Sequence, residues 1–567
     1  MKKWISYNKN YSNVNNFIKE FKISDTLARL LINRDIDSIE KAKNYLNPDI
    51  SQLHNPFEMF DMNKSLNRIE KAILEKEKIC IYGDYDVDGI TSVAMLYNFI
   101  KKLEGNAIYY IPDRLEEGYG LNTEAIKKII ALDVNLIITV DCGIRSVDEV
   151  DLANDSNIDV IITDHHKCGD ILPEAYSIIN PNQRQCKYPF KNLAGAGIVF
   201  KIITALSEKL LWKDYALDFL DLTALATVAD VVPLTDENRV MVQKGIEQVK
   251  KTKNLGLKAL INTCGIELTD LNAYHLGFII APRINAAGRL KDANIVVELL
   301  TTTDETKAYE IAKKLNELNY NRQQIENSML ETALRKIKHE MDLKTEHVIV
   351  LGDSSWHVGI IGIIASRITE KFNKPSIIIS IENEIGKGSA RSIKGLNIHE
   401  VLSKCEELLI KYGGHELAAG LTIEKRLIKD FRKKINDIVH KFKKDNPFYH
   451  EILVDYKIAN KVNLTNLFNE IKRLEPFGAG NPKPLFVYRF LALKEIKTVG
   501  LNGKHLSLKM FNGKEYIRGI GFNMGFVANH IEVNQKIDII CSVEMNTWNG
   551  EENIQLHIKD LKISKYK

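Results

Sequence analysis

The sequence predicts an α/β protein with a doubly wound parallel sheet, a second α/β domain joined to it by a long helix, and a C-terminal all-β barrel. Short continuous apolar runs alternate with helical stretches in the first half of the chain, which is typical of buried parallel strands. Residues 304–340 form one charged stretch without Gly or Pro. After about residue 450 the pattern changes to short strands separated by Gly and Asn turns.

Length and composition indicate a multidomain globular protein. The chain has 567 residues, 45% of them hydrophobic and 27% charged, which is too long for one hydrophobic core. No apolar run approaches the ~18–20 residues of a membrane helix, and the start, MKKWISYNKNYSNVNNF, lacks the apolar stretch of a secretory signal. Seven scattered cysteines without a CxxC pair indicate reduced thiols and no structural zinc site. We therefore expect a cytoplasmic protein with no membrane partner.

The charge is unevenly distributed. The net charge of +4 is too small to indicate a nucleic-acid partner by itself, but 17 Lys/Arg against 12 Asp/Glu follow residue 450, an excess of +5. Such local basicity attracts phosphates, although a lightly charged, solvated surface explains it equally well.

The pattern divides the chain into five regions. Strands are expected at 79–82, 135–140 and 159–163, then at 347–351 and 375–381, with a loop at 386–391. The connector helix would be ~50 Å long. Asn512-Gly513 and Asn549-Gly550 are hairpin signals in the tail, which favour an OB-like barrel over a β-sandwich. The regions are a helical segment 1–55 without visible chemistry, a first α/β domain 56–300 with a helical part, a connector 301–345, a second α/β domain 346–450 and the barrel 451–567.

Three aspartates follow the first predicted strand. Asp84, Asp86 and Asp88 alternate, and Gly89 allows a tight turn into a helix. Clustered carboxylates raise one another's pKa, so a cation is needed to hold them together. An EF-hand calcium loop is the competing interpretation, but its Glu at loop position 12 is absent.

Further candidate ligands follow the next strands. Asp141 ends the second strand, and Asp164-His165-His166 follow the third. Taken singly, Asp141 is as often a helix cap, and a pair of adjacent histidines is more often one structural and one surface residue. Asp230 ends another apolar run, where a buried carboxylate needs a partner.

Together these positions supply enough ligands for two divalent ions. Two ions can activate water and stabilise the leaving oxygen of a phosphodiester. Mainly oxygen ligands favour Mg²⁺ or Mn²⁺, and the imidazole ligands make Mn²⁺ the preferred ion. No Walker loop is present, so work driven by nucleotide hydrolysis is not expected.

DYDVDG, DCG and DHH, in this order, resemble the DHH phosphoesterase superfamily, and GGHELAAG (413–420) is similar to its DHHA1 substrate-binding domain. Five further segments narrow the resemblance to the RecJ exonucleases, which digest single-stranded DNA from the 5′ end. They are PRINAAGRL (282–290), LNELNYNRQQIE (315–326), WHVGIIGIIASRI (356–368), KGSARSI (387–393) and LEPFGAGNPKPLF (474–486). The resemblance covers nearly the whole chain from about residue 50.

The resemblance implies a role for each matching residue. It implies metal binding by Asp84, Asp86, Asp88, Asp141, His165 and Asp230, and catalysis by Asp141, His165 and His166, with Asp88 and His166 as ligands or close neighbours of ligands. Asp164 would lie beside the ligands and orient His165. Phosphates of DNA would be held by Arg283, Arg289, Ser389, Arg391, Gly413, Gly414 and His415. Outside this context, GGH would be interpreted as a helix-entry turn.

The expected activity is therefore 5′→3′ hydrolysis of single-stranded DNA to mononucleotides in DNA repair and recombination. The resemblance suggests a single-stranded-DNA-binding protein and a helicase as partners, and we expect a monomer. In the basic tail, bases would stack on aromatic rings such as Phe511, Tyr516 or Trp548. Two alternatives remain open: a DHH hydrolase of small nucleotides or pyrophosphate, and a non-catalytic replication scaffold. The connector and tail argue against the first, and the complete carboxylate set argues against the second.

Overall fold

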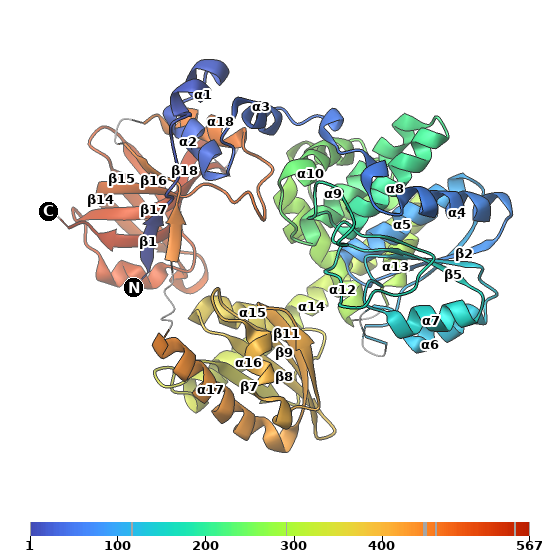
Figure 1. Ribbon diagram of the computed structural model, residues 1–567. Helices are drawn as coiled ribbons and strands as arrows, with labels where there is room; N and C mark the ends of the chain where they lie inside the picture. The colour runs from blue at the N-terminus through green and yellow to red at the C-terminus, as the bar shows by residue number, and fades with distance from the viewer. Residues whose placement is uncertain are drawn as a thin grey trace.

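The computed structural model describes residues 2–114, 117–118, 120–290, 292–445, 451–459, 462–548 and 551–565. Figure 1 shows three lobes, with the long helix α14 running between the first lobe and the second. Among the described residues, no helix combines the length and the apolar character needed to cross a membrane. All seven cysteines are free thiols.

The first lobe is built on a five-stranded parallel sheet of order β3-β2-β4-β5-β6. Successive side chains of a strand enter two different cores, because neighbouring residues such as Ile79 and Cys80 point to opposite faces. Helices α5 and α8 cover one face, and α6 and α7 cover the other. The doubly wound sheet is thus confirmed. Its elements are β2 (Lys78–Gly83), α5 (Val87–Lys102), β3 (Asn106–Tyr110), α6 (Thr123–Ile130), β4 (Leu136–Val140), α7 (Val147–Asp155), β5 (Asp159–Thr163), β6 (Ser177–Ile179) and α8 (Gly195–Lys209), preceded by α4 (Met62–Leu74).

A helical layer follows and ends in the connector. α14 (Glu305–Glu340) has 36 residues, and its first turn is capped by Asp304, whose carboxylate accepts hydrogen bonds from the N–H groups of Thr306 and Lys307. The predicted connector helix is therefore present. The preceding elements are α9 (Leu220–Ala229), α10 (Asp236–Val249), α11 (Leu255–Thr263), a π-helix (His275–Ile280), α12 (Ala281–Leu290) and α13 (Asn294–Thr301).

The second lobe has a mixed sheet of order β10-β11-β9-β8-β7, in which β7 and β8 are parallel. The segment expected to be a loop, 386–391, is instead part of strand β9. Its small residues hide the strand pattern, yet the sheet needs them, because a Cβ on Gly388 would lie 2.8 Å from Leu421. The elements are β7 (Ile349–Asp353), α15 (Ile361–Phe372), β8 (Ser376–Glu382), β9 (Ile385–Arg391), α16 (Ile398–Ser403), β10 (Lys411–Gly414), β11 (Ala418–Glu424) and α17 (Ile428–Asp445).

The C-terminal lobe is the predicted barrel. Five strands follow one another in the order β14-β15-β16-β18-β17, and β17 pairs with β14 to close the ring. The Asn512-Gly513 signal lies between β15 and β16, whereas Asn549-Gly550 lies outside the described residues. The elements are β13 (Tyr456–Ile458), α18 (Leu464–Lys472), β14 (Phe486–Val499), β15 (His505–Phe511), β16 (Tyr516–Gly521), β17 (Lys536–Trp548) and β18 (Glu551–Ile563).

The N-terminal segment packs on this barrel, although the two lie at opposite ends of the chain (Figure 1). Strand β1 (Lys3–Ser6) pairs in parallel with β12 (Glu451–Val454). Buried side chains of the helices α1 (Val14–Phe21), α2 (Asp25–Asn33) and α3 (Ile39–Leu46) share one core with the barrel. Removing either part would expose the core of the other. Our domain boundaries remain a prediction.

Candidate active site

The candidate ligands meet at the carboxyl edge of the first sheet. The strand order reverses between β2 and β4, which lie side by side although β3 separates them in sequence. Such a switch point is where open α/β sheets bind ligands. Asp84 follows β2 directly and Asp141 follows β4. His165 and its neighbours follow β5, and Asp230 ends helix α9.

His165 is the centre of the cluster. Its Nε2 atom lies 3.1 Å from Asp141 Oδ1, 3.7 Å from Asp230 Oδ2 and 3.9 Å from Asp88 Oδ2. Two triads have ligand-type atoms within 4.8 Å of one another: Asp141, His165 and His166, and Asp88, His165 and Asp230. The structure therefore brings together residues from four separate segments that the sequence singles out.

Two glycines permit this close approach. A Cβ on Gly89 would lie 2.5 Å from the carbonyl oxygen of Asp84, and a Cβ on Gly195 would lie 2.7 Å from Asp141 Cβ. Asp141 itself has a positive φ of 61°, a strained conformation for a residue with a side chain and one that recurs at functional sites. The start of α8 is therefore packed directly against the candidate ligand Asp141.

Two of the aspartates also have structural partners. Asp86 caps α5 by accepting hydrogen bonds from the N–H groups of Asp88 and Gly89. Asp88 accepts at 2.6 Å from Gly195 N and at 2.7 Å from Ala196 N, at the start of α8. Since both of its oxygens hold that helix terminus, Asp88 fixes α8 against the cluster. Its predicted role as a metal ligand remains a prediction.

The electrostatics of the cluster call for a cation. Burial, together with the charge of Asp86, raises the pKa of Asp88 to about 7. Burial, Asp88 and Asp86 raise the pKa of Asp230 to about 8. The pKa values of Asp84 and Asp141 are raised well above the ordinary range by burial and by neighbouring carboxylates. Asp84 Oδ1 and Asp230 Oδ2 are buried and accept no hydrogen bond within the described part of the chain. Oxygen-rich donors with one imidazole fit Mn²⁺ or Mg²⁺.

The pKa values of the two histidines are shifted in opposite directions. Burial and the charge of His166 lower the pKa of His165 to about 4, so its imidazole is neutral at pH 7 and suited to bind a metal. Burial would lower the pKa of His166 as well, but the hydrogen bond and charge of Asp164 raise it above the usual value. His166 is therefore the more cationic of the two.

Asp164 orients His166, not His165 as we expected. Asp164 Oδ1 lies 2.7 Å from His166 Nδ1 and accepts from the His166 N–H at 3.0 Å, while Oδ2 accepts from Ile144 N at 3.0 Å. Burial alone would raise the pKa of Asp164, but the bond and charge of His166 bring it below the ordinary value. Sequence cannot decide which of two adjacent side chains turns toward a carboxylate, because that depends on the path of the loop.

Sequence reasoning missed two asparagines that hold the DHH segment. Asn182 Nδ2 donates to the carbonyl of His165 at 2.7 Å, and Asn180 Nδ2 donates to the carbonyl of His166 at 2.9 Å. Both follow β6, a strand of three residues, which is too short to stand out as a pattern. The NPN sequence directly after the run SII was the available signal.

A cationic surface from both lobes adjoins the acidic cluster. Arg289 of α12 donates to the carbonyl of Gly359 in the second lobe at 3.0 Å. Arg391 donates to Ser389 Oγ at 3.1 Å. Burial and neighbouring arginines, Arg114 and Arg391 among them, lower the pKa of Arg289 to about 10. Arg114, which sequence reasoning missed, lies 4.8 Å from the Tyr85 ring centroid and acts on Asp84.

The other predicted phosphate-binding residues are placed differently. Arg283 donates to Asn316 and to the Ile279 carbonyl within the first lobe, so its place is explained without a substrate. Gly413 and Gly414 end strand β10 and do not enter a helix, which makes the helix-entry interpretation wrong. His415 N donates to the Ala418 carbonyl at 2.8 Å.

The exposed GGH tip faces the first lobe. The pKa of His415 is lowered by burial and by positive groups that include Arg145, His166 and Lys167. All three of these groups belong to the lobe that carries the acidic cluster. The charges around the acidic cluster therefore influence His415 at the tip. Contact of the tip with a phosphate remains a prediction.

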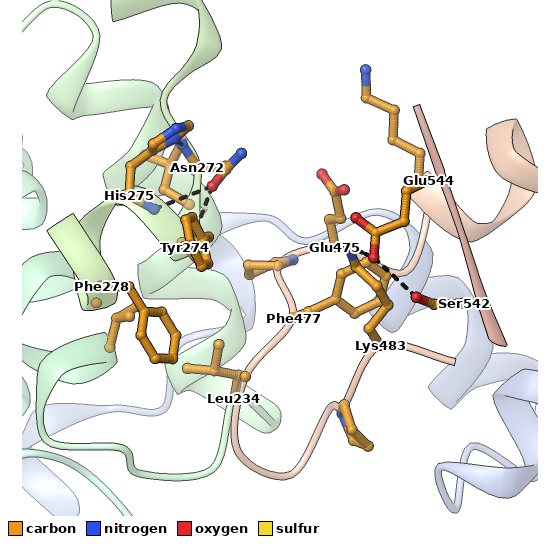
Figure 2. Close-up of a pocket in the computed structure, with 18 of the residues that line it drawn as sticks. Leu234, Asn272, Tyr274, His275, Phe278, Glu475, Phe477, Lys483, Ser542 and Glu544 are labelled. Atoms are coloured by element: carbon orange, nitrogen blue, oxygen red, sulfur yellow. Dashed lines mark hydrogen bonds and ion pairs between the residues drawn. The ribbon is translucent and has the colours of Figure 1, made fainter. Parts of the chain in front are cut away.

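A cleft of about 1410 Å³ separates the first lobe from the barrel and begins beside Asp230, at Ala229 and Val231. Figure 2 shows Tyr274 and Phe278 on one wall. Their rings are stacked with centroids 5.1 Å apart and are 61% and 72% exposed. They belong to or adjoin the π-helix, a form often found at functional sites.

The barrel supplies the opposite wall (Figure 2), which includes Phe477 and Glu544. Lys483 Nζ lies 3.2 Å from Glu544 Oε1 and offsets its charge, and His557 Nδ1 lies 3.2 Å from the same oxygen. Phe522 is 50% exposed and also lines the cleft. The cleft therefore combines exposed rings with few uncompensated acids.

Phe511 and Tyr516, two of the aromatic residues expected to bind DNA in the tail, do not line this cleft. Tyr516 is 61% exposed, with Lys509 Nζ 4.7 Å from its ring centroid, and Phe511 packs beside it. The side chain of Trp548 lies outside the described residues. Phe522, rather than Phe511 or Tyr516, lines the cleft opposite the first lobe.

Comparison with known families identifies three segments. Residues 78–227 match the DHH family, N-terminal domain; residues 345–441 match the DHHA1 domain; and residues 454–560 match the RecJ OB domain. These segments fall on the first sheet, the second lobe and the barrel.

Individual relatives agree along the whole chain. It is 37% identical over 566 residues to the single-stranded-DNA-specific exonuclease RecJ of Bacillus subtilis, covering 100% of this chain and 71% of the relative. The crystal structure of Thermus thermophilus RecJ in complex with Mn²⁺ superposes with a TM-score of 0.86 at 28% identity, covering 100% of this chain and 80% of that one. Its complex with Mg²⁺ gives a TM-score of 0.80 at 26% identity, with 100% and 78% coverage.

Substitution of Asp141 and of Asp164 should have different consequences. Asp141→Asn should abolish phosphodiester hydrolysis, because it removes the carboxylate that we predict to be a central metal ligand. Asp164→Asn should lower kcat ~10–100-fold by releasing His166, and it should add little in a His166→Ala background. Steady-state kinetics of the three variants and the double variant test this assignment. Near-normal hydrolysis by folded Asp141→Asn would exclude Asp141 as a ligand. If the losses of kcat from Asp164→Asn and His166→Ala are additive in the double variant, the two residues act independently and the assignment is wrong.

Proposed function

Because this chain belongs to the RecJ family of single-stranded-DNA-specific exonucleases, we propose that it hydrolyses single-stranded DNA from the 5′ end to mononucleotides. Its place in the cell would be the cytoplasm, in DNA repair and recombination. One observation carries the proposal: a buried carboxylate cluster at the sheet edge adjoins an arginine surface built by two lobes. This combination fits a metal-dependent reaction on a phosphate polymer.

The acidic cluster would hold two divalent ions. Asp84, Asp86, Asp141, His165 and Asp230 are the proposed ligands, and the neutral imidazole of His165 needs no deprotonation to bind. When bound, the ions would activate water and stabilise the charge on the leaving oxygen.

The protein's own groups would complete the chemistry. Asp164 raises the pKa of His166 and orients its ring. A protonated His166 would stabilise the phosphate or donate a proton to the leaving oxygen. Asp88 would keep the start of α8 in place. The positive charge of Arg114 lowers the pKa of Asp84 in the first lobe and the pKa of Arg391 in the second. Arg114 would therefore contribute to the electrostatic field of both lobes.

Polarity would arise from the second lobe. Arg391 and Ser389 are hydrogen-bonded to each other, and a Cβ on Gly362 would lie 3.2 Å from both Arg391 Nη2 and Ser389 Oγ. This close packing leaves the guanidinium little freedom and favours binding of one terminal phosphate. A 5′ phosphate held there would place the first phosphodiester over the carboxylates.

The rest of the strand would follow the cleft towards the barrel. Rings on both walls offer sequence-independent stacking, and the tail carries the excess of +5 that we noted from the sequence. A small-substrate hydrolase would have no use for such a cleft, and a non-catalytic scaffold would have no use for the carboxylate cluster. A single-stranded-DNA-binding protein and a helicase are proposed partners of a monomer, and the five predicted regions are proposed as its domains.

Arg391→Ala should reduce the preference for a 5′-phosphorylated strand over a 5′-hydroxyl strand, because it removes the terminal phosphate's bidentate partner. Rates on the two strands, each labelled at the 3′ end, measure the ratio in Mn²⁺. Arg426→Ala, at an exposed arginine of the same lobe, is the control and should leave the ratio unchanged. An equal loss on both strands would show that Arg391 binds the backbone generally.

Tyr274→Ala with Phe278→Ala should weaken binding of a long single strand by about 1–3 kcal/mol for each base that loses its stacking partner. Cleavage of short oligonucleotides at saturation should remain, since neither ring touches the carboxylates. Tyr309→Ala removes a 51% exposed ring from α14 and is the matched control. Point substitutions are preferable to deletion of residues 451–567, because such a deletion would uncover the core that the barrel shares with the N-terminal helices. Unchanged affinity would exclude the cleft as the path of the strand.

A further inference from the structure

One buried carboxylate lies at the junction of the two lobes. Glu326, on α14, is 1% exposed and contacts two arginines. Arg322 lies one turn earlier on the same helix, and its Nη1 donates to Glu326 Oε2. Arg367 belongs to α15 of the second lobe, and its Nη2 lies 2.5 Å from Glu326 Oε1. The carboxylate therefore joins the connector helix to the lobe that carries Arg391.

Arg322 is held from two sides. Its Nη2 donates to Asn319 Oδ1 at 2.7 Å, and its side chain is only 11% exposed. A guanidinium has five N–H donors, so the bonds to Glu326 and Asn319 leave three for a further acceptor. The orientation of Arg322 is thus fixed while part of its binding capacity remains.

The surroundings of Arg322 show which acceptor is needed. After burial, the largest influences that lower the pKa of Arg289 are Arg114, Arg322 and Arg391. Three arginines from three other segments therefore act on Arg289. Like charges at this density are stable only beside an anion, and a phosphate backbone supplies several.

We infer that Glu326 is a positioning residue for DNA binding: it fixes Arg322 beside Arg289 so that both guanidinium groups bind phosphates of the strand next to the scissile one. Its pair with Arg367 also holds the second lobe at the spacing that this arrangement needs. The inference rests on the proposed exonuclease function.

The direction in which DNA affinity changes when Glu326 loses its charge distinguishes a positioning role from simple charge repulsion. Removing a negative charge close to a DNA phosphate should strengthen DNA binding by Coulomb's law. Loss of positioning should do the opposite, because a mobile arginine loses side-chain entropy when it binds. A purely structural role would lower stability without a specific change in KM.

The test is steady-state cleavage of a 5′-phosphorylated single strand by E326Q in Mn²⁺. KM should rise about 10-fold while kcat stays within about twofold. In an Arg322→Ala background, E326Q should add little, because the two residues act as one unit. E346Q is the matched control: Glu346 is half-buried and paired with Arg432 in the same lobe, and KM should not change.

A second variant covers a failure of E326Q to fold. Arg322→Lys keeps the charge but loses the fork that Glu326 and Asn319 hold, and it should raise KM in the same way. A lower or unchanged KM in a folded E326Q or Arg322→Lys enzyme overturns the inference. Absence of cleavage by the wild-type protein would instead overturn the proposed function.

Discussion

Mutual repulsion among buried carboxylates is the constraint on which this structure depends. Asp84, Asp88, Asp141 and Asp230 meet at one edge of the first sheet, and each has a raised pKa. For Asp88, ionisation costs about 4 kcal/mol more than for an exposed aspartate. Such a cluster is retained only where cations offset the repulsion. The strand order, the positive φ of Asp141 and the close glycines all serve to bring these groups together.

Repulsion between like charges also constrains the junction of the first and second lobes. Where the first lobe gathers carboxylates, the junction of the lobes gathers arginines, with Glu326 buried between two of them. A phosphodiester offers anionic oxygens to both the ions and the arginines. A substrate bound between the two clusters would thus be held by the metal ions on one side and by the arginines on the other. The rings of the cleft, such as Phe278, would add affinity without base specificity.

Local features of the sequence were enough to predict the sheet and most of the cluster. Asp84 and Asp141 directly follow apolar runs, and parallel strands bring such positions to one edge. Features set by long-range packing could not be predicted. The sequence predicted a helical segment at residues 1–55, but not that its buried side chains, such as Leu30, share a core with the barrel. Strand β9 was hidden by small residues, and the partner of Asp164 depended on the path of one loop.

The most direct test is calorimetric titration of Mn²⁺ into the metal-free protein at pH 7, in two buffers of different ionisation enthalpy. Carboxyl groups with pKa values raised to about 7 and 8, as for Asp88 and Asp230, retain protons at this pH. Because these folded-state pKa values exceed that of an exposed aspartate, the folded protein loses stability as the pH rises through about 7 to 8. Metal ions that bind at pH 7 must displace the retained protons. The account predicts about one or more protons released per protein on binding, and fewer for Asp230→Asn. Tight binding without proton release, or no binding, would contradict it.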